Sequence, residues 1–383
     1  MRYPIGMIPI ATLLPKEDRR LLRGHIWAYR NEFAEIPKIA DGDEVDVVAQ
    51  NGRFIGRGYF QAEGGIAVRL VVRTRKDLDE PFFAQRISAC RAHREQWFPG
   101  SDVYRWIFGE SDRFPGLVAD RYGELVSIQA QSEFWNQRAE MIAKIFLAEP
   151  GVRSVVYVDK ARSDTKIFGE TTSSVICEID TLKFNVNLGS SQKTGLFLDQ
   201  RENWQLLERY VSGGSVLDGH CYVGAWGLHA AKYGAKKVVG VDTSESAISQ
   251  ARDHAELNGF SDTCEFQVND IQEALKEKES YDVVILDPPA LAKNRRYLNK
   301  ATGLYRALNR DAIQAIRPGG YLITSSCSQS MGLEDLISVV KRAAGSAQRQ
   351  ARLLEIRGAS PDHPVHLSMP ETEYLHCLVL QIM

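Results

Sequence analysis

Several features that define other classes of protein are missing from this sequence of 383 residues. It has no apolar run approaching the roughly 20 residues that cross a bilayer, so we expect no membrane partner. Residues 1–14 are mildly apolar, but Pro4 and Pro9 interrupt them and no small-residue cleavage site follows. A secretion signal is therefore not expected, and we predict a cytoplasmic protein.

The spacings of metal ligands are also missing. The six cysteines are scattered without a C-x-x-C pair, and the eight histidines show no ligand pattern. This distribution is typical of a reducing compartment and predicts no metal site. The net charge of −2 excludes a uniformly basic nucleic-acid binder, although a local basic surface is compatible with it. A hydrophobic content of 44% is that of an ordinary globular protein.

The most informative stretch covers residues 215–242, SVLDGHCYVGAWGLHAAKYGAKKVVGVD. A short apolar strand ends on Asp218, a turn with Gly219 and Gly224 leads into a helical pattern, and a second strand ends on Asp242. Glycines allow the backbone to approach a ligand, and an acid after the second strand can accept both ribose hydroxyl protons. The turn is not the GxGxxG fingerprint, so a nicotinamide pyrophosphate would lack its usual glycine cradle. The pattern indicates an adenosine-bearing cofactor or, alternatively, an ordinary strand–helix crossover.

Two further strands narrow this choice. Residues 265–268 lead into Asn269 and Asp270, and residues 281–286 lead into Asp287-Pro288-Pro289. Strands that end in polar residues predict a ligand site at the carboxyl edge of a parallel sheet. An Asp-Pro-Pro motif directly after a buried strand is typical of methyl transfer from S-adenosylmethionine to a planar base. With a strand over 321–325 and an antiparallel last strand over 374–383, we predict an α/β, Rossmann-like class I methyltransferase fold.

Two other regions precede this sheet. Residues 1–75 alternate apolar and polar residues between turn glycines, which predicts a β-rich module. Residues 76–190 mix a helix over 80–97 that Asp77 or Asp79 caps, a hairpin over 103–129, a helix over 134–147 and short later strands, so we expect an α+β domain. Residues 191–383 form the predicted methyltransferase domain.

The start of the first region is rich in cations. They form either a solvated face around two core aromatic residues, Trp27 and Tyr29, or a platform for RNA phosphates and bases. These cations are Lys16, Arg19, Arg20, Arg23 and Arg30.

Several motifs along the chain agree with one known family. They are Gly109-Glu110-Ser111-Asp112, Pro115-Gly116, Asp120-Arg121, Lys193-Thr194-Gly195, Leu198-Asp199-Gln200-Arg201, Val241-Asp242-Thr243-Ser244, Asp287-Pro288-Pro289, Ser326-Cys327-Ser328 and Asp362-His363-Pro364. On these motifs the sequence resembles the RlmI-type family of ribosomal RNA cytosine-5 methyltransferases over essentially its whole length. The resemblance implies an N-terminal PUA domain, a middle α+β domain and a C-terminal methyltransferase domain that uses S-adenosylmethionine.

The chain departs from the family at two positions. The family commonly has Tyr-Thr-Gly where this chain has Tyr222-Val223-Gly224, and an aromatic residue where this chain has Leu291. Neither difference affects the expected fold, but each changes a contact expected near the cofactor or the target base.

Methylation at carbon 5 of cytosine needs a nucleophile, because that carbon reacts only after a transient covalent bond forms at carbon 6. A thiolate is the natural group for this bond, and Cys327 follows a strand at the expected edge of the sheet. The alternative for Cys327 is a buried structural cysteine. Asp287 would hold the polar edge of the base and favour protonation of the ring, whereas its structural alternative is a strand-end cap. Sequence does not identify the base that removes the carbon 5 proton.

The resemblance and the strand ends together predict the cofactor contacts. We expect Asp242 on the ribose and Asn269 with Asp270 near the adenine. Asp218, Tyr222 and Gly224 would lie beside the methionine half, and Gln200 and Arg201 would close over it. Gly219 and Ser244 are also expected to contact the cofactor.

RNA is the expected partner. Residues 288–310 contain basic residues and no acidic one, and they leave directly from the predicted reaction centre, which favours contacts of Lys293, Arg295 and Arg296 with phosphates. The target cytosine must leave its stack, so a single-stranded or partly unfolded ribosomal RNA segment is expected. Two alternatives are an exocyclic-amine methyltransferase for guanine or adenine and a non-catalytic RNA-binding assembly factor. A homodimer is left open.

Overall fold

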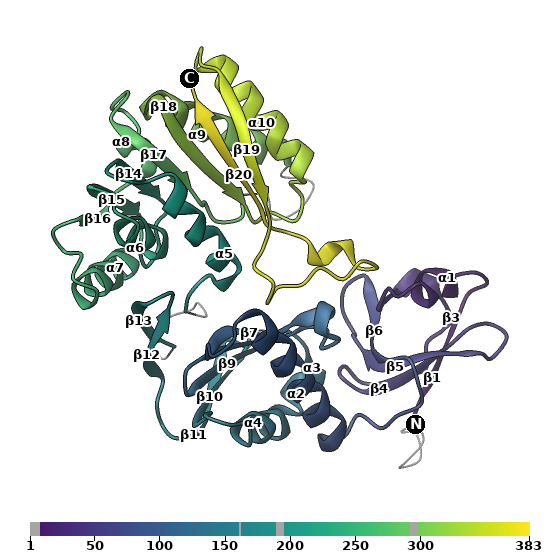
Figure 1. Ribbon diagram of the computed structural model, residues 1–383. Helices are drawn as coiled ribbons and strands as arrows, with labels where there is room; N and C mark the ends of the chain where they lie inside the picture. The colour runs from purple at the N-terminus through teal and green to yellow at the C-terminus, as the bar shows by residue number, and fades with distance from the viewer. Residues whose placement is uncertain (1–7, 161, 189–194, 292–297) are drawn as a thin grey trace. The chain divides into compact units, whose positions relative to one another are not determined.

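The computed structural model describes residues 8–160, 162–188, 195–291 and 298–383 (Figure 1). The chain divides into two compact units. The first unit comprises the described residues of Met1–Val175, Val186–Gly195 and Pro361–Thr372. The second unit comprises those of Ile176–Asn185, Leu196–Ser360 and Glu373–Met383. In all these residues, no helix is long and apolar enough to cross a membrane.

A six-stranded sheet forms the N-terminal part of the first unit, in the order β2-β6-β5-β4-β1-β3. Its apolar residues, such as Val45, Val47 and Leu70, are buried, which agrees with the alternation in the sequence. Gly58 allows neighbouring strands to approach, because a Cβ there would lie 1.9 Å from the carbonyl oxygen of Arg69. The elements are β1 (Ile10–Leu13), α1 (Asp18–Leu22), β2 (Trp27–Tyr29), β3 (Phe33–Glu35), β4 (Glu44–Val48), β5 (Phe54–Phe60) and β6 (Ile66–Val72).

A five-stranded sheet, in the order β11-β10-β9-β8-β7, follows in the same unit. Asp79, one of the two caps predicted for the helix over 80–97, caps that helix, because its Oδ1 accepts the N–H of Phe82 at 3.0 Å. The expected helix over 134–147 is two helices, and β11 has no counterpart among the predicted strands. The elements are α2 (Glu80–Trp97), β7 (Val103–Phe108), η2 (Gly109–Asp112), β8 (Leu117–Tyr122), β9 (Leu125–Ala130), α3 (Glu133–Asn136), α4 (Ala139–Leu147), β10 (Ser154–Asp159) and β11 (Asp164–Gly169).

A segment near the C-terminus, Pro361–Thr372, also belongs to the first unit. Asp362 Oδ2 accepts the backbone N–H of Arg105 at 2.8 Å, and the Asp362 carbonyl accepts Arg94 Nη2 at 2.9 Å. Farther along, the sulfur of Met369 accepts the N–H of Ile26 at 3.4 Å. The sequence predicts only a turn here, through Pro361-Asp362-His363-Pro364. We call this stretch the C-terminal segment.

The second unit contains a seven-stranded sheet in the order β16-β15-β14-β17-β18-β20-β19. The pairs among β14 to β18 are parallel, and β20 runs antiparallel to both β18 and β19. This confirms the predicted class I α/β fold with an antiparallel C-terminal strand. The strands are β14 (Ser215–Gly219), β15 (Lys237–Asp242), β16 (Cys264–Val268), β17 (Tyr281–Leu286), β18 (Ile316–Ser326), β19 (Ala351–Arg357) and β20 (His376–Ile382).

Helices cover this sheet, so its central strands are nearly continuous runs of buried Val, Ile and Leu. They are α6 (Ala225–Lys232), α7 (Glu245–Leu257), α8 (Ile271–Ala274), α9 (Leu298–Ala315) and α10 (Leu333–Ser346), preceded by η3 (Leu198–Gln200), α5 (Arg201–Trp204) and η4 (Gln205–Arg209). The chain passes from one unit to the other within a two-stranded hairpin of β12 (Ser174–Ile179) and β13 (Leu182–Asn187).

Candidate active site

Asp287 and Cys327 follow neighbouring parallel strands. Leu286, the last residue of β17, lies opposite Thr324 of β18, so both strands deliver their next residues to the carboxyl edge of the sheet. The sulfur of Cys327 lies 3.8 Å from the carbonyl oxygen of Pro288. All six cysteines lie in the described residues, and Cys327 alone among them is not buried. The residue predicted as the nucleophile is therefore the one with access to the surface.

The electrostatic surroundings of Cys327 keep it protonated. Burial, followed by the negative charges of Asp287 and Asp199, raises the pKa of its thiol to about 12. At neutral pH the sulfur is a thiol. Removal of one of these charges would lower this pKa, although burial is the largest cause of the rise.

Two N–H donors hold the carboxyl group of Asp287. Gln200 Nε2 donates to Oδ1 at 2.9 Å, and Trp226 Nε1 donates to Oδ2 at 3.0 Å. Burial raises the pKa of Asp287 to about 7, while the hydrogen bonds from Trp226 and Gln200 act against this rise. The group can therefore exchange a proton near neutral pH.

These contacts add to what the sequence indicated. Gln200 was predicted beside the cofactor, but in the structure its amide contacts Asp287, and its Oε1 accepts Asn203 Nδ2 at 2.7 Å. Trp226 was not predicted at all. Its only indication in the sequence is its place two residues after Gly224, at the start of the helix that follows the turn.

We call residues 218–224 the cofactor loop. Asp218 is fully buried, and its Oδ2 accepts the N–H of Gly227 at 2.9 Å. Its Oδ1 has no hydrogen-bond partner within the described part of the chain, and burial raises the pKa of this carboxyl to about 8. A buried carboxylate oxygen without a partner suits a positively charged ligand, and S-adenosylmethionine carries such charges on its ammonium and sulfonium groups.

The glycines of the cofactor loop permit close packing. Gly224 has φ +84°, and a Cβ there would lie 2.7 Å from Phe266 Cζ. At Gly219, a Cβ would lie 2.6 Å from Ile271 Cδ1. Tyr222 also has a positive φ, at 50°. The loop therefore depends on residues without a side chain at two positions, as a cradle for a ligand does.

Asp242 connects the cofactor loop to the next strand end. Its Oδ2 accepts the N–H of Tyr222 at 3.1 Å, and its Oδ1 accepts the N–H of Ser244 at 2.9 Å. Each carboxylate oxygen has a further lone pair, so both can still accept a ribose hydroxyl. The contact of Asp242 with a ribose stays a prediction.

Other residues predicted near the cofactor also make contacts within the protein. Ser244 caps α7 through the N–H of Ala247 at 3.3 Å, and Asp270 caps α8 through the N–H of Gln272 at 2.8 Å. Asn269 Oδ1 accepts the N–H of Asp270 at 2.9 Å. Arg201 begins α5 and is buried. Contacts of these residues with a cofactor stay predictions.

Basic residues in two regions were candidates for contacts with RNA, and the structure describes the N-terminal region. Lys293, Arg295 and Arg296 lie outside the described residues. In the N-terminal sheet, Arg20 pairs with Glu32 at 2.7 Å, and Arg30 Nη2 donates to the carbonyl of Gln61 at 2.6 Å. Arg20 and Arg30 therefore make contacts within the protein, whereas Lys16, Arg19 and Arg23 are exposed, and both readings of that basic stretch stay open.

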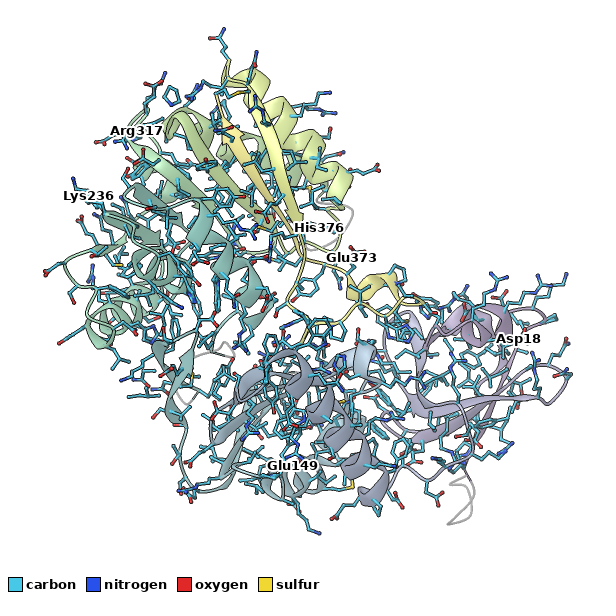
Figure 2. All side chains as sticks on the ribbon, viewed as in Figure 1. Asp18, Glu149, Lys236, Arg317, Glu373 and His376 are labelled. Atoms are coloured by element: carbon cyan, nitrogen blue, oxygen red, sulfur yellow. The ribbon has the colours of Figure 1, made fainter. Side chains whose placement is uncertain are left out.

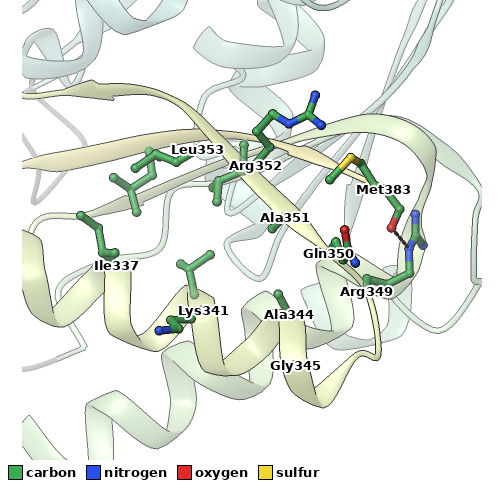
Figure 3. Close-up of a pocket in the computed structure, with 13 residues that line it drawn as sticks. Ile337, Lys341, Ala344, Gly345, Arg349, Gln350, Ala351, Arg352, Leu353 and Met383 are labelled. Carbon is green, nitrogen blue, oxygen red and sulfur yellow. Dashed lines mark hydrogen bonds between the residues drawn. The ribbon is translucent and has the colours of Figure 1, made fainter.

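A groove of about 520 Å³ lies elsewhere in the second unit, between α10 and the strands β19 and β20 (Figure 3). Apolar side chains such as Ile337 and Leu353 line it, together with Lys341 and Arg352. Among the described residues, none of the predicted site residues lines this groove, and neither Asp287 nor Cys327 belongs to its lining.

Comparison with known families supports the assignment of both ends of the chain. A family model described as a PUA-like domain matches residues 11–73. A second model, described as an S-adenosylmethionine-dependent methyltransferase, matches residues 142–365. The cofactor is therefore S-adenosylmethionine, as predicted.

Curated relatives match almost the whole chain. The ribosomal RNA large subunit methyltransferase I of Shewanella denitrificans is 35% identical over 394 residues, which cover 97% of this chain and 98% of the relative. The protein of the same name from Aeromonas salmonicida is 34% identical over 388 residues, which cover 96% of this chain and 98% of the relative.

Solved structures share the fold. A structure from Streptococcus mutans, assigned as an S-adenosylmethionine-dependent methyltransferase, has a TM-score of 0.85 at 20% identity and covers 98% of this chain and 100% of that chain. Trm5b from Pyrococcus abyssi has a TM-score of 0.54 at 14% identity and covers 98% of this chain and 99% of that one. The class I fold, the polar residues at the carboxyl edge of its sheet and the full-length matches to curated relatives agree. The chain belongs to the family of S-adenosylmethionine-dependent methyltransferases that includes ribosomal RNA large subunit methyltransferase I.

Proposed function

We propose that this protein methylates carbon 5 of a cytosine in large-subunit ribosomal RNA through a transient covalent bond to Cys327. The observation that carries the proposal is the position of Cys327. It is the one cysteine of six that is not buried, and it follows the strand next to that of Asp287. The names of the relatives support ribosomal RNA as the substrate.

Cys327 makes carbon 5 reactive. Its sulfur forms a bond to carbon 6 of the ring, and the electron pair of the C5–C6 double bond moves towards ring nitrogen 3, which takes up a proton. Carbon 5 is then an enamine carbon and can attack a methyl group. Afterwards carbon 5 loses its proton to a base that the sequence does not identify. The bond between sulfur and carbon 6 breaks, and the proton on ring nitrogen 3 returns through Asp287 to the sulfur, which restores the aromatic ring and the thiol.

Asp287 transfers the proton in this scheme. Its carboxylate takes the proton from the thiol of Cys327 and gives it to ring nitrogen 3, so the net first step adds S–H across the ring. A pKa of about 7 suits a group that must both accept and donate a proton near neutral pH. Gln200 and Trp226 fix the orientation of the carboxyl plane.

The cofactor loop holds the methyl donor. S-adenosylmethionine, when bound, supplies the methyl group that carbon 5 attacks. Asp242 would bind the ribose hydroxyls, and Oδ1 of Asp218, which has no partner in the described residues, would accept from the positively charged methionine half. Asn269 and Asp270 lie after β16 and bind the adenine.

The proposal is tested with purified protein, S-adenosylmethionine and large-subunit ribosomal RNA from a strain that lacks the protein. Bisulfite sequencing should detect one new 5-methylcytosine with the wild type and none with Cys327→Ala. RNA that contains 5-fluorocytidine should give a covalent complex stable to denaturation, because fluorine cannot leave carbon 5 as a proton does. Cys177→Ala, which replaces a buried cysteine, is the matched control and should retain activity. Full cytosine methylation by Cys327→Ala would contradict the proposal.

Methylation of an exocyclic amine is the second candidate. The high pKa of Cys327 favours it, because amine methylation needs Asp287-Pro288-Pro289 but no thiolate. Mass spectrometry of digested RNA separates the two. Methylguanosine or methyladenosine that survives in Cys327→Ala would identify this reaction.

The organisation of the chain is also part of the proposal. The predicted domains at 1–75, 76–190 and 191–383 would place an RNA-binding PUA domain ahead of the catalytic domain. Limited proteolysis should cut near residues 75 and 190 if these boundaries are right. Light scattering measures whether the chain forms a homodimer.

A further inference from the structure

Three arginines and a histidine gather in the first unit, whereas the residues assigned to catalysis belong to the second unit. Arg73 follows β6, Arg86 belongs to α2, Arg113 follows η2, and His366 belongs to the C-terminal segment. We call these four residues the arginine surface. Burial lowers the pKa values of Arg73, Arg86 and His366, and the charge of Arg113 acts on each of them in the same direction, as a nearby cation does.

Hydrogen bonds fix this arrangement. Arg86 Nη1 donates to the carbonyl oxygens of Val71 at 3.0 Å and Arg113 at 2.8 Å. Arg73 Nη2 donates to the carbonyl of His25 at 3.1 Å. The arginine surface is therefore built from the sheet of the N-terminal part, from α2 and from the turn after η2.

The C-terminal segment is fixed to the same place. Ser368 Oγ donates to the carbonyl of Arg23 at 2.7 Å. Gly24 beside it has φ +120°, and a Cβ there would lie 2.3 Å from Ser368 Oγ. Only glycine allows this approach, so the position of His366 and Leu367 is determined by the packing beneath them.

No carboxylate in the described residues forms an ion pair with Arg73, Arg86 or Arg113. Other arginines of the same unit are paired: Arg94 lies 2.6 Å from Asp112, and Arg105 lies 2.6 Å from Asp120. Burial lowers the pKa of Arg86 to about 10, with the charge of Arg113 as the second cause. Cations that repel one another without an internal counter-charge are suited to an external anion.

An apolar side chain stands beside these cations. Leu367 is 97% exposed, and Val365 of the same segment is 45% exposed. Arg113 is exposed as well, with a left-handed backbone at φ +60°. A ligand that offers both negative charges and flat apolar faces at short intervals matches this combination, and a nucleic-acid strand has both.

We propose that the arginine surface and Leu367 bind the sugar–phosphate backbone and a neighbouring base of the substrate RNA. Arg73 and Arg113 contact phosphates, and Leu367 contacts the face of an unstacked base. This inference rests on the proposed function, because it assigns a second contact to the same RNA. It gives the C-terminal segment a role outside the methyltransferase sheet.

Fluorescence anisotropy of a labelled single-stranded ribosomal RNA fragment that contains the modified cytosine tests the inference in the full-length protein. Arg113→Asn removes the charge and keeps a residue that tolerates the left-handed backbone. We expect Kd to rise about threefold to tenfold, and the slope of log Kd against log salt to fall by about 0.7, the value for one phosphate contact on a single strand. Leu367→Ser should weaken binding without changing the slope, because it removes an apolar contact.

Arg153→Asn is the matched control, since Arg153 is an exposed arginine of the same unit that pairs with Glu124 at 3.2 Å. It should bind RNA as the wild type does. Wild-type values of Kd and salt slope in both Arg113→Asn and Leu367→Ser would overturn the inference. Poly-L-glutamate that binds the wild type but not Arg113→Asn, while RNA binds both proteins equally, would also overturn it, by identifying an acidic protein as the ligand. A wild type that neither binds nor methylates ribosomal RNA would instead refute the proposed function.

Discussion

Replacing Asp287 by Asn should make Cys327 more reactive towards alkylation even though methylation is lost. In the wild type, burial raises the pKa of the Cys327 thiol to about 12, and the charge of Asp287 adds to this effect. At pH 8 a thiol of that pKa is ionised to only about one part in ten thousand. Asp287→Asn removes the neighbouring negative charge while it keeps the volume of the side chain.

The size of the effect can be estimated from the charge that is removed. One like charge nearby raises a pKa by about one to three units, so its loss should raise the thiolate fraction at least about tenfold. A thiolate of lower pKa is also a weaker nucleophile, with a Brønsted coefficient of about 0.5, which cancels half of the gain on a logarithmic scale. We therefore expect Cys327 in Asp287→Asn to react about three to thirty times faster at pH 8.

The ratio of the two alkylation rates should depend on pH through the ionisation of Asp287. Asp287 itself has a pKa of about 7, so below pH 7 the wild-type carboxyl is already neutral and the two proteins should react at similar rates. Above pH 7 the wild-type carboxyl is charged, and the ratio of the rates should rise to its plateau. A methanethiosulfonate reagent with peptide mass spectrometry measures Cys327 separately from the five buried cysteines.

Asp282→Asn is the control for the loss of one charge on the same strand. Asp282 pairs with Arg317, which is labelled in Figure 2, at 2.9 Å. This variant should not change the reactivity of Cys327. Equal rates for the wild type and Asp287→Asn from pH 6 to pH 9 would refute the electrostatic coupling between Asp287 and Cys327.

Three further variants test neighbouring contacts. Trp226→Phe removes the N–H that stabilises the Asp287 anion, so the pH at which the reactivity ratio rises should move up by about one unit in the same assay. Gly224→Ala places a Cβ 2.7 Å from Phe266 Cζ at a positive φ, and urea unfolding should show a loss of about 2 kcal/mol or more. Burial raises the pKa of Asp218 to about 8 in the folded state, so its ionisation removes stability as pH rises from about 4 to 8. Asp218→Asn should therefore lose less stability than the wild type between pH 5 and pH 8, measured by urea unfolding.

Elements whose pattern is local could be predicted from the sequence. The strands expected over 215–217, 238–241 and 281–286 are β14, β15 and β17, because continuous apolar runs between turn residues specify buried parallel strands. The polar residues after these strands could be placed at one edge for the same reason, since parallel strands share their direction. This step was enough to bring Asp287 and Cys327 together in the prediction.

Contacts between distant residues could not be predicted in this way. Trp226 and Asp287 are 61 residues apart, and nothing in either local sequence indicates that the indole N–H reaches that carboxylate. The attachment of the C-terminal segment to the first unit could not be predicted for the same reason, because Asp362 and Arg105 are separated by 257 residues. Such contacts depend on the tertiary arrangement, not on periodicity.

The helix α10 is a different case. Its buried residues Leu336, Val339, Val340 and Ala343 recur at helical spacing, so the pattern was present although no helix was predicted there. β11 gave no such pattern, because most of its residues are exposed on an edge strand. An edge strand takes its structure from the neighbour with which it pairs.

The arrangement of Asp287 and Cys327 couples the reactivity of the thiol to the presence of the target cytosine. Without a base, Asp287 is ionised above pH 7, and its charge helps to keep Cys327 protonated and unreactive towards oxidants. In the proposed mechanism, a cytosine at the carboxyl edge offers ring nitrogen 3 as an acceptor for the proton that Asp287 takes from the sulfur. The proton then leaves the carboxyl–thiol pair at the moment when the sulfur bonds to carbon 6. The high pKa of Cys327 in the free protein is therefore compatible with covalent catalysis, because the nucleophile is generated where its target is bound.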